Sequence, residues 1–526
     1  MDDKLDNSVN FHKHSSLRCC CGNTDMGHQG ISRRKFVQMT GAGTLGIITI
    51  QRLTWDMLAN ERPVDEYLPA RQPLVVKPVL TYEVPERREK TSWRAWGGIQ
   101  TENDASAEIA RINSELKKLK SDADFPVDFL PVSAVRSRQD LAGITDIDRA
   151  DLILIYAAGG GMNIFAELNS RGKDIIFFCR HRSGPVYLWY EIISPRYLRQ
   201  HTDELKVKGV DDSDVVIDSQ DELLWRMRAL CGLKNTRGSR ILAIGGFGAW
   251  SQPLETTMKM VKEHYNFEIR DISYENLGNL IKEAREDRAL VKQAKSSSDR
   301  YLADTGIKLE TERKYVENCF VLGEVFRRLM EREGCRAITV NNCMGTIMPI
   351  ADTTACLTLS LLNDAGFLAF CESDFVVIPA GILLANISGK PSFLNDPTYP
   401  HDWLITLAHC TAPRRMNGIT LEPARIMTHF ESDFGAAPKV EMKKGQVVTN
   451  VIPDFEFRKY IGLPGKIVEN PFMDICRSQI EVSFSCESEK VAKNMRGFHW
   501  LTVYGDYLKE TGYALKKIGI EFEILT

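Results

Sequence analysis

Short apolar runs alternate with helix-length segments from about residue 75 to about residue 390. Each run ends near glycine, asparagine or a charged residue, as in DLILIYAAGGG, DIIFFCR, SRILAIGGFGAW and CRAITVNNC. This alternation is typical of parallel α/β layers. The clearest helix is expected over residues 311–334, TERKYVENCFVLGEVFRRLMEREG, where apolar residues recur at helical spacing and Gly334 ends the helix.

The pattern changes to strands after about residue 390. The segments WLITLAHC, ARIMTHF, KVEMKKGQVVTNVI and CRSQIEVSFSC are short, rich in Val, Ile and Thr, and partly alternating. Within them KKGQ predicts a hairpin turn. The end of the chain predicts a helical stretch, TVYGDYLKETGYALKKIG, and a final strand, IEFEIL.

These patterns predict an α/β protein with two parallel-sheet domains of the Rossmann or flavodoxin type and a mainly antiparallel β C-terminal domain. The expected divisions are a signal and linker over 1–70, an N-terminal α/β domain over 71–235, a second α/β domain over 236–388 and the β-rich domain over 389–526.

Composition describes an ordinary globular protein. The chain has 526 residues, 43% of them hydrophobic and 26% charged, and its formal net charge is -3. This length predicts roughly two to four domains. The charge shows no basic excess of the kind that nucleic-acid partners require. No run of about 18 apolar residues follows residue 50, so a membrane-spanning helix is not expected there.

The N-terminal region has the pattern of an export signal. Arg33 and Arg34 precede a weakly apolar run, Met39–Ile50, which is too short for a membrane span. A twin-arginine pair before such a run is typical of a Tat signal. The alternative is a basic helix start in a tail. We therefore expect export to the periplasm by the Tat machinery, or a cytoplasmic protein if the signal does not function.

The thirteen cysteines predict no disulfide framework. Cys19, Cys20 and Cys21 lie ahead of the twin arginines, and the other ten show no C-x-x-C pair and no regular spacing. Several stand in apolar contexts such as IIFFCR and LAFCES. We expect buried free thiols.

Two glycine-rich turns, GGG at 159–161 and GGFG at 245–248, follow apolar strands and could cradle a phosphate. Neither completes G-x-G-x-x-G, and glycine is common at strand ends for turn reasons alone. No nucleotide cofactor is expected.

Four acidic and histidine residues lie in short polar breaks within apolar sequence. They are Glu372 in FCESDF, Asp396 in PSFLNDP, His409 in LITLAHCTAP and His499 in RGFHWLTVYGD. Buried carboxylates are costly unless a cation, a proton or several hydrogen bonds compensate them. Together the four predict a metal site, and the mixture of carboxylate and imidazole suits Mn²⁺, Fe²⁺, Co²⁺ or Zn²⁺.

Each candidate also has an ordinary structural explanation. A histidine at a strand end is often a satisfied core residue, and Asp396 before Pro397 is a common turn opener. Glu372 can be a solvated charge at a helix start. Asp374 can cap a helix that begins near Phe375. The residues alone leave both interpretations open.

Five motifs follow one another along the chain: CESD (371–374), ISGKP (387–391), FLND (393–396), HCTAP (409–413) and HWLTVYGD (499–506). Their order resembles that in the L-fucose isomerase and L-arabinose isomerase superfamily. The resemblance covers roughly residues 75–526, with specific motifs only in the last third. It implies two α/β domains, a β-rich C-terminal domain and homo-oligomers.

The resemblance also implies aldose–ketose isomerisation, or epimerisation, of a free sugar or sugar derivative through a cis-enediolate. By this resemblance Glu372 and Asp396 match the carboxylates that bind Mn²⁺ and transfer protons, with Glu372 as the base. His409 and His499 match histidine ligands. The candidate substrate contacts are Asp374, Asn342 and Arg414.

Two other functions stay open. The same enediolate chemistry could end in elimination from a keto-sugar, which would change the mass of the product. Alternatively, the chain could be a non-catalytic carbohydrate-binding protein on the same fold.

Overall fold

The computed structural model describes residues 71–187, 198, 209–250 and 252–526. The predicted signal, with Arg33, Arg34 and Cys19–Cys21, lies outside these residues, so export stays a prediction. In the described part no single helix is long and apolar enough to cross a membrane, although one bent pair of helices, Cys343–Ala351 with Cys356–Asp364, passes on length and composition together.

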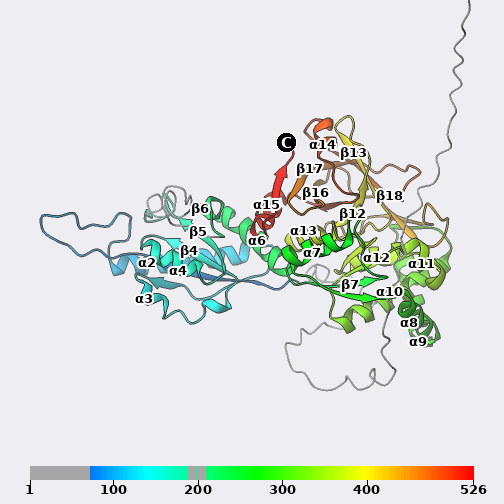
Figure 1. Ribbon diagram of the computed structural model, residues 1–526, viewed down its shortest axis with the longest axis horizontal. Coiled ribbons are helices and arrows are strands. Elements are labelled where there is room, and N and C mark those ends of the chain that lie inside the picture. Colours follow the sequence, from blue (N-terminus) through cyan, green and yellow to red (C-terminus); the bar gives the residue numbers. More distant parts are fainter. Residues whose placement is uncertain (1–70, 188–197, 199–208, 251) are drawn as a thin grey trace, which may run out of the picture. The chain divides into compact units, whose positions relative to one another are not determined.

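The N-terminal part of the described chain contains a six-stranded sheet whose strands are all parallel. Its apolar runs are buried on both faces, which explains their lack of alternation. In Figure 1 α2 and α4 lie beside β4 and β5. The strands are β1 (Leu74–Thr81), β2 (Val127–Phe129), β3 (Ser133–Val135), β4 (Leu152–Ala157), β5 (Asp174–Cys179) and β6 (Val215–Ile217), and the helices are α2 (Glu102–Asp122), α3 (Arg138–Leu141), α4 (Met162–Asn169) and α6 (Gln220–Thr236).

A second parallel sheet has the strand order β11-β10-β7-β8. The helix expected over 311–334 is confirmed as α10, and Gly334 ends it in the left-handed conformation at φ 65°. The strands are β7 (Arg240–Ile244), β8 (Glu268–Ile272), β10 (Ala337–Val340) and β11 (Leu368–Cys371), and the helices are α7 (Leu254–Tyr265), α8 (Tyr274–Glu286), α9 (Arg288–Leu302), α10 (Arg313–Glu333), α11 (Cys343–Ala351), α12 (Cys356–Asp364) and α13 (Ile378–Ser388).

The C-terminal strands form an antiparallel barrel (Figure 1, yellow to orange). The order is β16-β19-β12-β13-β18-β17, and β17 pairs back with β16 to close it. β20 adds to β17 in the parallel direction. The elements are β12 (Phe393–Pro397), β13 (Leu404–His409), β16 (Val447–Ile452), β17 (Lys459–Glu469), β18 (Ser478–Ser483), α14 (Ser488–Asn494), β19 (Trp500–Tyr504), α15 (Leu508–Lys517) and β20 (Glu521–Ile524). The predicted fold class is therefore confirmed.

A small three-stranded sheet joins distant parts of the chain. β9 (Ile307–Glu310) pairs in parallel with β14 (Ala424–Met427), which pairs antiparallel with β15 (Ala437–Val440). The three larger sheets fall within the three predicted domain ranges, whereas this sheet takes strands from two of them. The domain boundaries stay a prediction.

Two expectations from local sequence are wrong. KKGQ does not connect a hairpin, because β15 pairs with β14 while β16 pairs with β17 and β19. The turn contains Gly445, whose amide donates to the carbonyl of Ile467 in β17. The helical stretch expected from Thr502 starts later, at α15, because Thr502–Tyr504 complete the buried strand β19. Barrel closure overrides the local signal in both places.

Helix α12 holds the segment that follows β13. The hydroxyl of Ser360 donates to the carbonyl of Ala412 at 2.7 Å. The carboxylate of Asp364 accepts the amide of Arg415 at 2.7 Å, and its second oxygen is buried without a partner. Burial raises the pKa of Asp364 to about 6.

The substitution Asp364→Asn should remove a pH-dependent loss of stability. The ordinary pKa of aspartate is about 3.9, so below about pH 4 this carboxyl is protonated in the folded and unfolded states alike. Between about pH 4 and pH 6 the carboxyl ionises in the unfolded chain but stays protonated in the folded protein, so the free energy of unfolding falls by up to about 3 kcal/mol and levels off above pH 6. Denaturant unfolding of both proteins between about pH 4 and pH 7 measures this. A stability difference that does not change with pH would contradict it.

Candidate metal centre

Glu372 stands in a left-handed turn directly after β11. Its φ is 65° and that of Ser373 is 48°, a conformation that side chains other than glycine rarely adopt. The amide of Ser373 donates to the hydroxyl of Thr339 at 3.1 Å. Gly248 bonds the turn on both sides, because its amide donates to the carbonyl of Ser373 and its carbonyl accepts the amide of Phe375, each at 3.0 Å. These three hydrogen bonds hold the turn.

The absence of a side chain at Gly248 favours this close contact. A Cβ atom there would lie 3.3 Å from the carbonyl oxygen of Ser373 and 3.5 Å from that of Glu372. Gly248 is the last residue of GGFG, so at least this glycine of the motif serves the close approach of two loops. The explanation of the GGFG motif as a turn at a strand end, without a bound phosphate, thereby has a structural basis.

The barrel supplies the other three candidates from neighbouring strands. Asp396 lies in β12, opposite Ala408 of β13, and His409 is the last residue of β13. His499 immediately precedes β19, which pairs with β12 on its other side. Antiparallel pairing of these strands therefore brings both histidines and Asp396 to one end of the barrel.

The four predicted residues meet in one cluster. Nε2 of His409 lies 3.7 Å from Oε1 of Glu372, and Nε2 of His499 lies 3.4 Å from Oε2 of the same carboxylate. Nε2 of His499 is also 3.3 Å from Oδ1 of Asp396. The two imidazole rings are 6.0 Å apart between centroids. Glu372 thus lies between two imidazole nitrogens.

Each imidazole is oriented through its other nitrogen. Nδ1 of His499 is 2.9 Å from Oδ2 of Asp374, and Nδ1 of His409 is 3.1 Å from the hydroxyl of Thr411. A carboxylate that orients a histidine in this way is typical around metal ligands. Sequence reasoning missed this role of Asp374, since no local signal connects residues 125 positions apart.

The carboxylates of the cluster strongly favour positive charge on or between the two imidazoles. Burial opposes ionisation of His499, but Asp374 and Glu372 outweigh it and raise the pKa of His499 to about 10. Burial likewise opposes ionisation of His409, while Glu372 and Asp396 raise its pKa well above the ordinary value. Burial also acts on Glu372, yet the two imidazoles hold the pKa of that carboxyl well below its usual range. Two protons on the imidazoles, or one divalent cation, would satisfy this demand.

The donor set fits a divalent cation. Nε2 of His409 is buried and has no hydrogen-bond partner, which is costly unless something else binds it. One donor atom from each of Asp396, His409 and His499 lies within 4.8 Å of the others. Glu372 adds a fourth donor between the two imidazole nitrogens. Two carboxylates and two imidazoles suit Mn²⁺, Fe²⁺, Co²⁺ or Zn²⁺.

The carboxylates are the accessible part of the cluster. The side chains of Glu372 and Asp396 are 30% and 38% exposed, whereas both histidines are 1% exposed. Trp250 packs edge-on against His499 at 5.5 Å between ring centroids, and its other neighbour, Phe498, is 52% exposed. An incoming molecule would meet two carboxylates beside an aromatic surface.

The three candidate substrate contacts are placed differently. Asp374 is buried against His499, and its Oδ1 accepts the amide of Val376 at 3.1 Å, just ahead of α13. Arg414 is buried and its guanidinium pairs with Asp304 at 2.9 Å. Asn342 lies at the carboxyl end of β10, the same sheet edge as Glu372, in a left-handed conformation. Substrate contacts from these residues stay predictions.

The fold is therefore an α/β protein in which the carboxyl edge of a parallel sheet meets one end of a β-barrel, and two carboxylates and two imidazoles that could hold a metal gather there. No protein-family model matches the chain. The chain is similar to a sulfoquinovose isomerase from Clostridium sp. (strain MSTE9), with 24% identity over 263 residues. The match covers 46% of this chain and 58% of that protein, so it spans a little over half of the relative's length.

The substitution Asp374→Asn should weaken Mn²⁺ binding by about 10- to 100-fold, because the amide no longer fixes the ring and tautomer of His499. Isothermal titration of Mn²⁺ into the metal-depleted protein measures the change. Asp122→Asn, at an exposed carboxylate ending α2, is the matched control and should bind as the wild type does. Equal affinity of Asp374→Asn and the wild type would show that His499 does not need this partner.

Proposed function

We propose that the protein is a metal-dependent isomerase of aldose and ketose sugars, or an epimerase that uses the same intermediate. The observation that carries this proposal is the meeting of Glu372, Asp396, His409 and His499 in one cluster, in which the buried Nε2 of His409 makes no hydrogen bond. The similarity to a sulfoquinovose isomerase supports a small-molecule sugar as the substrate.

The four residues are the proposed cation ligands. When bound, the cation, expected to be Mn²⁺ or another divalent ion such as Co²⁺, Fe²⁺ or Zn²⁺, would polarise the carbonyl and adjacent hydroxyl of an open-chain sugar. The buried imidazoles and the accessible carboxylates have different proposed roles. His409 and His499 hold their position through Thr411 and Asp374, while Glu372 and Asp396 face the sugar.

The two carboxylates suit complementary roles, with Glu372 as the base and Asp396 as the carboxylate that helps to hold the cation. Glu372 has a lowered pKa and stays ionised, as a general base must. It takes the proton from the carbon beside the carbonyl, and the C–H electron pair forms the cis-enediolate. Burial raises the pKa of Asp396, but as a cation ligand its carboxylate would be ionised and would help to hold the cation at the two substrate oxygens, between which one proton passes. Return of the first proton to the neighbouring carbon completes an isomerisation without net oxidation.

The aromatic surface suits the sugar chain. Trp250 and Phe498 lie 4.9 Å apart between ring centroids, next to His499. Apolar C–H faces of sugars pack well on aromatic rings, which fix orientation without specifying one hydroxyl pattern. Export through the Tat machinery and homo-oligomerisation remain part of the proposal as expectations from the sequence.

The substitution Glu372→Gln should lower the rate of proton exchange at least about 100-fold, because it removes the base and a cation ligand together. The full chain is depleted of metal with a chelator, reloaded with Mn²⁺ and incubated with a panel of aldoses and ketoses in D₂O. Proton NMR then detects deuterium at the carbon beside the carbonyl. Glu89→Gln, at an exposed site in the first α/β part, is the matched control and should exchange at the wild-type rate.

The outcomes separate the candidate functions. Deuterium entry with an isomeric product of unchanged mass supports the isomerase or epimerase. A product of lower mass indicates elimination from a keto-sugar instead. Sugar binding without exchange, at any metal loading, indicates a carbohydrate-binding protein. A wild-type protein that binds neither metal nor sugar overturns the proposal.

A further inference from the structure

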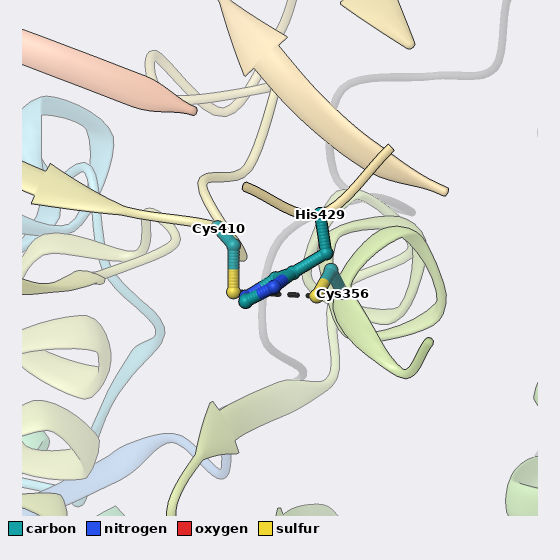
Figure 2. Close-up of side chains that lie close together, drawn as sticks. All are labelled: Cys356, Cys410 and His429. Atoms are coloured by element: carbon teal, nitrogen blue, oxygen red, sulfur yellow. Dashed lines mark hydrogen bonds between the residues drawn. The ribbon is translucent and has the colours of Figure 1, made fainter. Parts of the chain in front are cut away.

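A second group of side chains that could hold a metal adjoins the four residues above, since Sγ of Cys410 lies 3.8 Å from Nδ1 of His409. Cys356, Cys410 and His429 each offer a donor atom, and these atoms all lie within 4.8 Å of one another. The two sulfur atoms are 3.3 Å apart. Figure 2 shows the three side chains converging from separate segments, with the imidazole beside the two hydrogen-bonded thiols. We call these residues the sulfur cluster.

The segments that carry the sulfur cluster are tied together. Cys356 is the first residue of α12, and Cys410 directly follows β13. His429 lies two residues after β14, where its amide donates to the carbonyl of Phe434 at 3.0 Å and closes the loop. The carbonyl of Ala436 then accepts the hydroxyl of Thr354 at 2.9 Å and the amide of Leu357 at 3.2 Å. The loop after β14 is thereby fastened to the start of α12.

The cluster is buried and incompletely satisfied. Cys356, Cys410 and His429 are 0%, 3% and 4% exposed. Nδ1 of His429 is buried without a hydrogen-bond partner, which typically costs about 1–3 kcal/mol. Burial also lowers the pKa of His429, so its imidazole is neutral and keeps a free lone pair. The apolar cluster that contains both cysteines has one other member, Ala437. Hydrophobic packing alone therefore gives little reason for a histidine here.

We propose that Cys356, Cys410 and His429 bind a second cation of soft or borderline character, Zn²⁺ being the expected ion. Two thiolates and one imidazole are donors that select such ions over Mn²⁺. Binding would release one proton from each thiol, and the two resulting charges would neutralise the dication inside the protein. The thiols of Cys371 and Cys476 interact with Cys410 and are the candidates for a fourth donor.

The proposed site would stabilise the neighbouring metal centre. Cys410 is the residue after His409, and Cys371 precedes Glu372. A cation bound by Cys410 would fix the end of β13 against α12 and the loop after β14. The inference does not depend on sugar turnover, because its measurement is metal content and sulfur coordination.

The direct test is titration of Co²⁺ into the metal-depleted full chain, followed in the near ultraviolet. Thiolate ligands give a sulfur-to-cobalt charge-transfer band, which carboxylates and imidazoles do not give. The wild type should show the band and, when purified from zinc-supplemented medium, should hold about one Zn²⁺ per chain by elemental analysis. Cys356→Ser and His429→Gln should each lose most of the Zn²⁺ and weaken the band.

Matched controls separate this site from the proposed catalytic one. Cys335→Ser and His264→Gln alter a buried cysteine and a partly buried histidine elsewhere and should keep the Zn²⁺ and the band. Glu372→Gln should also keep both, even though it removes a ligand of the first centre. Failure of turnover with an intact band would therefore affect only the proposed function.

Three results would overturn the inference. The first is the absence of the charge-transfer band in the wild type, where no substitution can have disturbed the fold. The band could disappear in Glu372→Gln but persist in Cys356→Ser, which would assign its sulfur to Cys371 at the first centre. Mass analysis without reduction could find Cys356 and Cys410 joined by a disulfide, which would make the pair a redox element instead of a metal site.

Discussion

The left-handed turn at Glu372 and Ser373 is the constraint on which the candidate metal centre depends. Two consecutive non-glycine residues in this region cost of order 1–3 kcal/mol each, so the surrounding structure must impose the conformation. The side-chain hydroxyl of Thr339 in β10 and the backbone of Gly248 in the loop after β7 impose it through hydrogen bonds. The turn places one carboxylate between two imidazoles supplied by the barrel. Without it, the α/β and β parts of the chain would contribute separate, incomplete sets of ligands.

Much of the fold could be predicted because its signals are local. Runs such as DLILIYA and AITV are too apolar for any place but a buried parallel strand, and α10 shows a helical repeat with a glycine stop. The barrel was predicted less well. β17 contains Pro464 and two glycines, which hide a strand from propensity alone, and its partners are chosen by closure of the barrel.

Only part of the candidate site could likewise be predicted from the sequence. Glu372, Asp396, His409 and His499 are visible in the sequence because each interrupts an apolar run. The residues that make them a site are not: Asp374 and Thr411 orient the imidazoles, and Gly248 supports the turn. The sulfur cluster is the extreme case, since its three residues come from three segments and show no ligand spacing. Such relations exist only after the strands have paired.

The parallel pairing of β9 with β14 bears on how the protein can be divided. Arg425 and Glu310 form an ion pair across it at 2.6 Å although they are 115 residues apart. A gene fragment that stops near residue 388 would produce β9 with a bare edge, and one that starts there would leave β14 paired on one side only. Exposed edges of this kind invite aggregation. The smallest expressible piece that keeps this region intact therefore extends across both strands, and the chain is better shortened from its ends than cut in the middle.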